Sequence, residues 1–373
     1  MSRTASDARP VPGAATPRPT VPRGVRPAGY GVLRPASVSF LVHRRSVAVA
    51  LVLAVLLAAA VVLSLCVGES FVPPDQVVRV LLGRPSPDQL VVGTLRLPRL
   101  VVGLLSGTAF GLAGALIQTV ARNPLASPDV IGVTQGAGAA TVAAISFDLV
   151  GHDQLPYASV AGGLAAALLV YAFAWRRGLN ASRFVLVGIA VSVALGSVVQ
   201  LLLTKGDILA AQQAKVWLTG SLNSRGYDQA SPLALVLLPA VPALLWAARA
   251  QRAVSFDDQT ATALGVRLNR TRVGLTALGV VLASVATGAT GPIGFVALLA
   301  PQLARRLTRA PQTPLLSSAL TGALVVVVAD LLARRLFSPV ELPVGVLTAV
   351  VGAPYLMWLI SRSRNRGRSG GTS

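Results

Sequence analysis

The sequence predicts an all-α polytopic membrane protein with about ten transmembrane helices. Of its 373 residues, 53% are hydrophobic and only 12% are charged, whereas a soluble domain carries about 25% charged residues. From residue 46 onward, apolar runs that could each cross a bilayer follow one another along the chain. Both observations indicate that lipid is the solvent of this chain.

The two ends of the chain differ from this apolar body. Residues 1–45 are rich in Pro and Arg and show no apolar periodicity, so we expect a disordered basic tail. The tail is too long and too often broken by proline for the start of a signal peptide, and the first apolar segment is expected to be retained. Residues 362–373 form a second basic tail. The membrane domain is therefore predicted to cover 46–361.

A transmembrane helix needs about 20 mostly apolar residues. The predicted spans are 46–68, 100–120, 129–148, 156–175, 184–204, 231–249, 272–290, 294–308, 314–336 and 342–361. The run at 294–308 is short and contains Pro301, so it is predicted to be either a buried span or a partial one. Nine spans are the alternative to ten.

The basic residues predict the orientation, because loops rich in Arg and Lys stay in the cytoplasm. With the N-terminal tail inside and ten alternating spans, 24 of the 33 basic residues lie on the cytoplasmic side. Both termini are therefore expected in the cytoplasm. This topology explains the net charge of +20. The charge is therefore no indication of nucleic-acid binding.

A polar island interrupts the apolar pattern between the sixth and seventh spans. Residues 255–270 read SFDDQTATALGVRLNR. Acids favour the first turn of a helix and glycine its end, so the island predicts a short helix that starts near Asp257 and Asp258 and stops at Gly265. A solvated loop is the alternative, but a segment ordered by its own signals favours docking on a partner.

Sequence features of enzymes and metal sites are not visible. Neither lysine, Lys205 or Lys215, follows a glycine, so there is no phosphate-binding G-x-x-x-x-G-K-[ST] loop and no ATP hydrolysis is expected on this chain. No catalytic constellation, cofactor site or metal site is expected. Asp330 is the one acid deep in an apolar run, where acids are suspected of function, but its spacing favours a structural pair with Arg334 at i+4.

Glycines and prolines shape two stretches of the apolar body. Gly103, Gly107 and Gly111 recur at every fourth position and form one stripe on a helix. Such stripes allow helix backbones to approach closely in lipid, and packing within the chain is the favoured interpretation. The residues Gly291, Pro292 and Gly294 break the chain between two spans. Breaks at membrane depth are tolerated where they are buried or line a cavity, which is typical of transporters.

Seven stretches, in order, resemble one family. They are LRLPRLVVGLLSGTAFGLAGALIQ (95–118), RNPLASPDVIGVTQGAG (122–138), VLVGIAV (185–191), WLTGSL (217–222), DDQTATALGV (257–266), GPIGFVALLAPQLARRL (291–307) and ADLLARRLFSPVELPVGVLTAVVGAPYLMWLI (329–360). Together they resemble the permeases of iron-siderophore and vitamin B12 ABC importers, the FecCD/BtuC type. The resemblance covers about 46–361.

The resemblance implies the architecture of a type II ABC importer permease. Two permease subunits, alike or different, would enclose the path, with two ATP-binding cassette subunits below and a substrate-binding protein outside. Ferric siderophore is the implied cargo, with cobalamin or haem as alternatives. The polar island matches the segment that couples to the ATPase. Its contact residues would be Phe256, Asp257, Asp258, Thr262, Leu264 and Gly265.

The resemblance also implies roles for residues at both membrane faces. Arg96, Arg99 and Arg334 match arginines that receive acidic residues of the binding protein, and Arg335 could share that role. Headgroup anchoring is the alternative. Asn123 and Leu125 match one cytoplasmic gate, and Ala181 and Ser182 match the other. Gln302 stands where many relatives carry histidine, which argues against metal or proton chemistry there.

Two other classes of protein remain as alternatives. A secondary transporter driven by an ion gradient would need carboxylates in the middle of spans, and Asp330 is essentially the only one. A structural membrane scaffold would need neither the coupling segment nor the helix breaks. The leading prediction is therefore an importer permease in the cytoplasmic membrane of a bacterium.

Overall fold

The computed structural model describes residues 30–33, 40–68, 70–176, 178, 180–310 and 312–368. Two units are distinguished, Met1–Arg44 and Arg45–Ser373. In the first unit, β1 (Tyr30–Leu33) pairs antiparallel with β2 (Phe40–His43), with Tyr30 opposite His43. The expectation of no regular structure over 1–45 is wrong for these strands, whose sequences YGVL and FLVH are rich in β-branched and aromatic residues. Residues 1–29 and 34–39 lie outside the described part.

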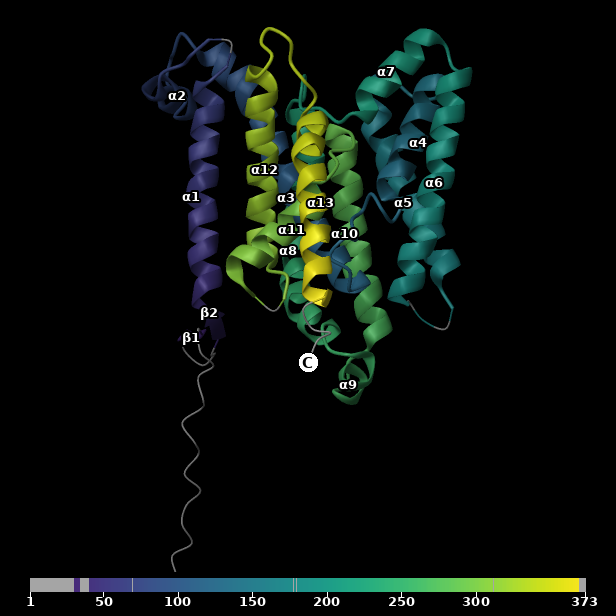
Figure 1. Cartoon of the computed structure of the whole chain (residues 1–373). Coiled ribbons are helices and arrows are strands. Elements are labelled where there is room, and N and C mark those ends of the chain that lie inside the picture. Colours follow the sequence, from purple (N-terminus) through teal and green to yellow (C-terminus); the bar gives the residue numbers. More distant parts are fainter. Residues whose placement is uncertain are drawn as a thin grey trace, which may run out of the picture. The chain divides into compact units, whose positions relative to one another are not determined.

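The second unit is a bundle of helices (Figure 1). In chain order they are α1 (Arg44–Cys66), α2 (Pro74–Leu81), the π-helical η1 (Leu90–Arg96), α3 (Leu97–Ala121), α4 (Val133–Ser146), the short η2 (His152–Gln154), α5 (Leu155–Ala174), α6 (Ala181–Lys205), α7 (Ile208–Leu218), α8 (Tyr227–Val254), α9 (Asp258–Ala263), α10 (Leu268–Thr290), α11 (Val296–Thr308), α12 (Leu315–Arg335) and α13 (Val344–Arg368). Each of the ten predicted spans coincides with one of these helices. α2, α7 and η1 were not predicted, and α13 continues past 361 into the predicted C-terminal tail.

Two of the predicted spans are too short to cross a membrane as straight helices. Among the described residues, seven helices are long and apolar enough to span, and the apolar part of α13, Val344–Leu359, is shorter than the span predicted at 342–361. α4 has 14 residues and α11 has 13, and at 1.5 Å per residue each reaches only about 20 Å of the roughly 30 Å required. α11 starts late because Phe295 takes a left-handed conformation, with φ of 67°. The partial-span alternative for 294–308 is therefore the one that the structure adopts.

α3 is the central helix of the bundle. η1 and α3 form one continuous helix. In its most apolar 18-residue window, 78% of the residues are buried, against 11% in the corresponding window of α6. The predicted glycine stripe faces α12. A Cβ atom at Gly107 would lie 2.6 Å from the carbonyl oxygen of Gly322, and one at Gly111 would overlap the carbonyl oxygen of Ser318. The stripe therefore lets the backbones of α3 and α12 touch, and dispersion contacts at this distance stabilise helix pairs in lipid.

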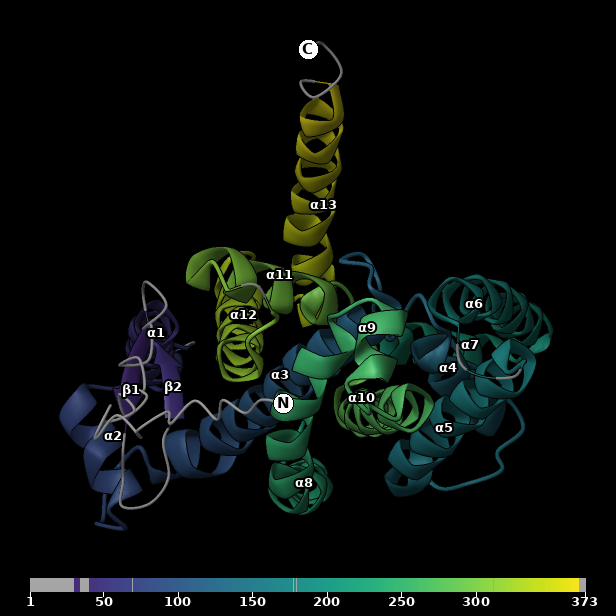
Figure 2. The ribbon, with the colours of Figure 1, turned by 90° about the horizontal axis from the view of Figure 1, so that it is seen from below.

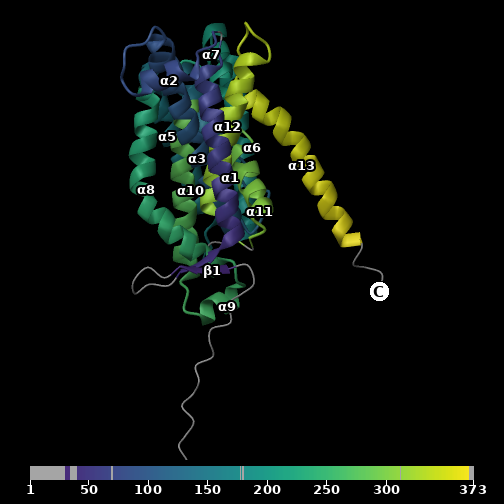
Figure 3. The same ribbon diagram turned by 90° about the vertical axis from the view of Figure 1, so that its left-hand side faces the viewer.

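α13 leaves the bundle at its first residues. Figures 2 and 3 show it extending away from the other helices of its unit. Its side chains Val350, Val351 and Met357 are more than 60% exposed. A helix with such a surface requires lipid or another chain around it, because water around these side chains would cost free energy. Toward its far end, Arg306 of α11 lies over the rings of Tyr355 and Trp358, 5.5 and 4.6 Å from their centroids.

Candidate functional site

The predicted short helix of the polar island is present as α9, at the end of the bundle opposite α2 and α7 (Figure 1). Asp257 caps its first turn, since its carboxylate accepts a hydrogen bond of 2.9 Å from the backbone N–H of Thr260. Gly265 follows the last turn with φ of +79°, a conformation that glycine adopts without strain. Phe256, Thr262 and Leu264 are exposed. The helix therefore presents an apolar and polar surface at this end of the helical bundle.

Asp258 ties α9 to two long helices. Its Oδ1 lies 2.8 Å from Arg122 Nη2 and 2.6 Å from Arg272 Nη2. Arg122 ends α3 in a left-handed conformation and also donates hydrogen bonds to the backbone carbonyls of Val254 and Phe256. Arg272 belongs to the first turns of α10 and its side chain is only 6% exposed. We call Asp258, Arg122 and Arg272 the α9 latch.

The α9 latch is charged at neutral pH. The hydrogen bond from Arg272, followed by the positive charges of Arg272 and Arg122, lowers the pKa of Asp258 below its usual value. A carboxylate with a lowered folded-state pKa stabilises the fold at every pH above its usual pKa of about 4, and loses that effect only as the pH falls through the lower value. The latch therefore does not open by titration in the neutral range.

At the opposite end of the bundle, two predicted arginines converge on Asp330. Arg99 donates two hydrogen bonds, of 3.0 and 2.8 Å, to Asp330 Oδ1, and its third nitrogen bonds Glu341 at 2.9 Å. Arg334 Nε lies 3.1 Å from Asp330 Oδ2, so the predicted i+4 ion pair is present. The side chain of Asp330 is 4% exposed. Asp330 is thus a structural acid that joins α3 to α12.

Arg96 has a different role from the predicted one. The residue is 8% exposed, and its guanidinium donates to the carbonyls of Leu65, Cys66 and Ser70 at 2.7, 3.2 and 2.6 Å. It therefore satisfies the free carbonyls at the end of α1, and its charge is not presented outward as predicted. Arg335 is exposed and makes one described bond, to the carbonyl of Gly68 at 2.6 Å, so it remains open to a partner.

Replacing Asp330 by Ala is expected to destabilise the bundle by about 3–5 kcal/mol, because two buried guanidinium groups would lose their counter-charge. Thermal and denaturant unfolding of the purified protein in detergent would measure the change. Glu341→Gln is the matched control. Its side chain is 32% exposed, and loss of its pair with Arg99 should cost at most about 1 kcal/mol. Equal effects of the two substitutions would contradict this account of Asp330.

The two predicted gate segments lie in separate surroundings. Asn123 accepts a hydrogen bond of 2.9 Å from the N–H of Leu125, which folds the turn after α3. Asn123 also lines a cavity of about 300 Å³, whereas Leu125, Ala181 and Ser182 do not. Ala181 and Ser182 open α6, where the capping residue is Asn180, whose side chain accepts from the N–H groups of Ser182 and Arg183.

Gln302 connects α11 to the turn that carries Asn123. Its side-chain nitrogen donates to Gln118 Oε1 at 2.6 Å and to the carbonyl of Pro124 at 3.2 Å. Gln118 in turn donates to the carbonyl of Leu298 at 3.1 Å. Both glutamines are buried, so these amide bonds hold α3, α11 and the turn in one arrangement. Composition alone gave no signal for this network.

The predicted break at Gly291 and Pro292 is a close junction of three chain segments. Ser221 N–H donates to the carbonyl of Thr290 at 2.9 Å, and Gly345 N–H donates to that of Gly220 at 3.1 Å. A Cβ atom at Gly291 would lie 3.2 Å from the Cα of Gly220. Gly294 has open space beside it. The break therefore joins the ends of α7, α10 and the start of α13.

The described residues contain no group of three or more His, Cys, Asp or Glu side chains that could hold a metal ion. The arrangement offers instead a tethered surface helix at one end, a charged cluster at the other, and short or broken helices between them.

Comparison with known proteins identifies relatives of the whole bundle. Residues 56–362 match the FecCD transport family. The chain is 39% identical over 328 residues to the achromobactin transport system permease protein of Dickeya dadantii, covering 87% of this chain and 93% of the relative. It is 39% identical over 296 residues to the ferric enterobactin transport system permease protein of Escherichia coli, covering 78% of this chain and 89% of the relative.

A solved structure shares the fold. It is a metal-chelate type ABC transporter in an inward-facing conformation, with a TM-score of 0.73 and 28% sequence identity, and the match covers 85% of this chain and 99% of that one. The ten matched helices, the extent of the family match and the identity to the relatives agree with the resemblance inferred from the motifs. The chain is a multi-pass membrane protein and belongs to the FecCD transport family.

Proposed function

We propose that this chain is the membrane-spanning permease subunit of an ATP-driven importer that moves ferric siderophores across the bacterial cytoplasmic membrane. The observation that carries the proposal is the match to the FecCD transport family over 56–362, joined to a surface helix, α9, that is tied to the long helices. The relatives named for achromobactin, ferric enterobactin and Fe(3+)-citrate transport favour an iron chelate as cargo.

In this proposal α9 is the coupling helix. More of the Arg and Lys residues in the connecting loops lie in the loops at this end than in those at the other, which favours a cytoplasmic position for α9. Phe256, Asp257, Thr262, Leu264 and Gly265 would contact a separate ATP-binding cassette subunit, where ATP is hydrolysed. Asp258 would act mainly through its two arginines. A displacement of α9 would then pull on the end of α3 and the start of α10.

The opposite end would receive a substrate-binding protein that delivers the chelate. Arg335 is the exposed arginine suited to an acidic residue of that protein, since a guanidinium can bind a carboxylate through two parallel hydrogen bonds. Arg99 and Arg334 support this surface through Asp330. Arg96 would contribute only by holding the end of α1.

A second permease subunit, identical or different, would cover the apolar surfaces that the single chain leaves exposed. α6 and α13 carry such surfaces, including Leu186, Val193, Val350 and Met357. The transport path would run along the interface between the subunits, with the turns at Asn123 and Leu125 and at Ala181 and Ser182 closing it on the cytoplasmic side.

Deleting the gene from its host is expected to abolish uptake of radiolabelled iron on one or more siderophores and to leave cobalamin and haem uptake unchanged. The measurement compares cells with and without the gene on a panel of chelates, in a strain that keeps any partner permease of this chain and the cobalamin and haem importers but lacks the other siderophore permeases. Restoration by the plasmid-borne gene is the control. Loss of cobalamin or haem uptake alone would change the cargo, and no loss of any of the three would refute the proposal.

A further inference from the structure

A cavity of about 970 Å³ lies at the α7 end of the bundle, opposite α9. Its walls come from the start of α5, from α7, from the loop between α7 and α8, and from the segment 341–343. Cavities of about 300–1,000 Å³ hold small molecules. Part of the wall is apolar, including Leu155, Trp217 and Leu342, and part is polar, including Gln213 and Asn223. The cavity therefore suits an amphipathic molecule of the size of a chelate.

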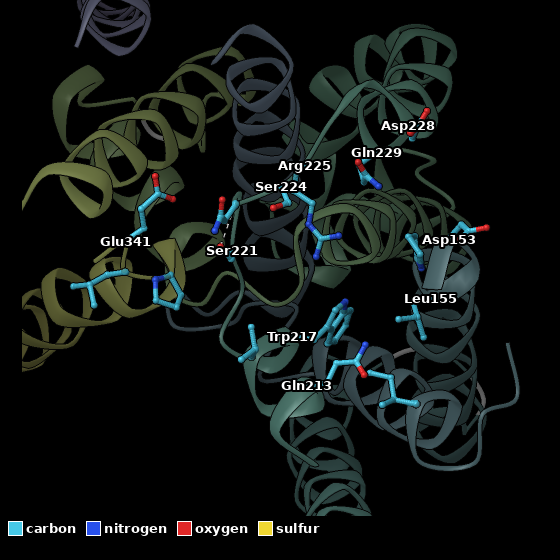
Figure 4. A pocket seen from close by; sticks show the side chains of 16 residues that line it. Asp153, Leu155, Gln213, Trp217, Ser221, Ser224, Arg225, Asp228, Gln229 and Glu341 are labelled. Carbon is cyan, nitrogen blue, oxygen red and sulfur yellow. Dashed lines mark hydrogen bonds between the residues drawn. The ribbon is translucent and has the colours of Figure 1, made fainter. Parts of the chain in front are cut away.

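Arg225 projects into the middle of this cavity (Figure 4). Its guanidinium points toward the side of the cavity that carries Trp217 and Gln213. Its Nε is buried and has no hydrogen-bond partner, and within the described part of the chain no ion pair involves this side chain. Burial lowers the pKa of Arg225, and no carboxylate offsets that effect. A buried polar group without a partner costs free energy that a bound anion would recover.

Four other arginines that are buried or half-buried are already occupied by the protein. Arg96 is bound to carbonyls, Arg99 and Arg334 to Asp330, and Arg272 to Asp258. Arg225 thus differs from them in facing an open volume. This contrast indicates that its partner comes from outside the chain.

Three carboxylates line the same cavity, and their positions limit the charge of the ligand. Glu341 is paired with Arg99 at 2.9 Å. Asp153 and Asp228 lie at the margin in Figure 4, and their carboxylates point away from Arg225. A ligand with one exposed anionic group could reach Arg225, whereas a ligand with several negative charges would meet the two marginal acids. Attraction to Arg225 and repulsion from the two acids together favour a ligand with a low negative charge.

We propose that Arg225 binds a carboxylate of a ferric carboxylate chelate during its passage. This inference rests on the proposed function and narrows its substrate class. A guanidinium fork matches a carboxylate in two parallel hydrogen bonds. The apolar wall at Leu155 and Trp217 would contact the carbon skeleton of the chelate. Neutral chelates have no group for Arg225 and would pass without its help.

The test measures uptake of radiolabelled iron on two probes, a ferric tris-hydroxamate with one free carboxylate as the carboxylate chelate and its neutral methyl ester, by cells that express the complete importer. Arg225→Gln is expected to raise the apparent KM for the carboxylate chelate about tenfold or more, the loss of a charge-assisted hydrogen bond. The maximal rate for this chelate and the uptake of its neutral methyl ester should stay unchanged. Arg225→Lys should recover part of the affinity. Arg84→Gln, an exposed arginine just after α2 at the same end, controls for the loss of one positive charge.

Each outcome bears on a different statement. An unchanged KM for the carboxylate chelate in Arg225→Gln, or an equal loss on both probes, would overturn the role of Arg225, as would a wild-type importer that carries only the neutral ester. Failure of the wild type to import either probe, with intact protein in the membrane, would overturn the carboxylate chelate as cargo, whereas siderophore import itself is refuted only by failure on the whole chelate panel. The wild-type panel and the variant ratio therefore separate the two failures.

Discussion

Replacing Asp258 by Lys is expected to abolish chelate uptake while the permease still folds and assembles. The new ammonium would face Arg122 and Arg272 where a carboxylate now lies 2.8 and 2.6 Å from them. Like charges about 4 Å apart near a protein surface repel by about 4 kcal/mol. Because the Asp258 side chain is 53% exposed, solvent screening reduces the net cost to about 1–2 kcal/mol.

That cost is sufficient to detach α9 and too small to unfold the bundle. α9 has six residues and cannot hold its place by intrinsic helix stability, whereas a folded protein has about 5–15 kcal/mol in reserve. The expected phenotype is therefore uncoupling. In the purified complex in liposomes, ATP hydrolysis should continue and chelate transport per ATP should fall to background.

The controls separate coupling from folding. Asp75→Lys introduces the same change on α2, at the other end of the bundle, and should transport normally. Exchange of the pair, Asp258→Arg with Arg272→Asp, should restore part of the transport, because one of the two ion pairs is rebuilt. Normal transport by Asp258→Lys would show that the α9 latch is not the coupling element. Transport that is unchanged in Asp258→Lys but stops when an ionophore collapses the ion gradient would favour the secondary-transporter alternative.

The membrane-spanning helices of this protein could be predicted because lipid demands the same properties of every segment that crosses it. A chain segment in hydrocarbon must be helical and apolar, so the runs of Leu, Val and Ala predicted all ten helices within a few residues. The short α9 was also predictable, because Asp257 and Gly265 act on their own local backbone. The helices α2 and α7 were missed, since with 8 and 11 residues they are shorter than a span.

Charge pairs over long sequence distance could not be predicted. The Arg334–Asp330 pair follows from an i+4 spacing, whereas the Arg99–Asp330 pair joins residues 231 positions apart and has no periodicity. Arg96 was misassigned because an arginine at the end of a span has the same sequence signature whether it faces a partner or the carbonyls of Leu65 and Cys66. Arg225 was also not predicted, because its cavity is assembled from four segments that are separate in the sequence.

Placing leucine at both Gly107 and Gly111 is expected to prevent the permease from folding. The nearest atoms to the new side chains would be backbone atoms of Gly322, Ala323, Ser318 and Ala319 in α12, which cannot rotate aside as a side chain can. Overpacking of a core commonly costs about 1–3 kcal/mol per site, and here each Leu must also separate two helix backbones. Together the two substitutions would remove much of the free energy of unfolding, which is about 5–15 kcal/mol for a folded protein.

The amount of monodisperse protein in detergent and its melting temperature measure this effect. Gly196→Ala in α6 is the matched control, because the nearest atom to its new Cβ lies 3.8 Å away, and alanine favours a helix over glycine by about 1 kcal/mol. That variant should melt at the same temperature or higher. If Gly107→Leu melted like Gly196→Ala, the backbones of α3 and α12 could not be in contact. The Arg99–Asp330 ion pair would then be their main connection, and Asp330→Ala should separate the two helices by itself.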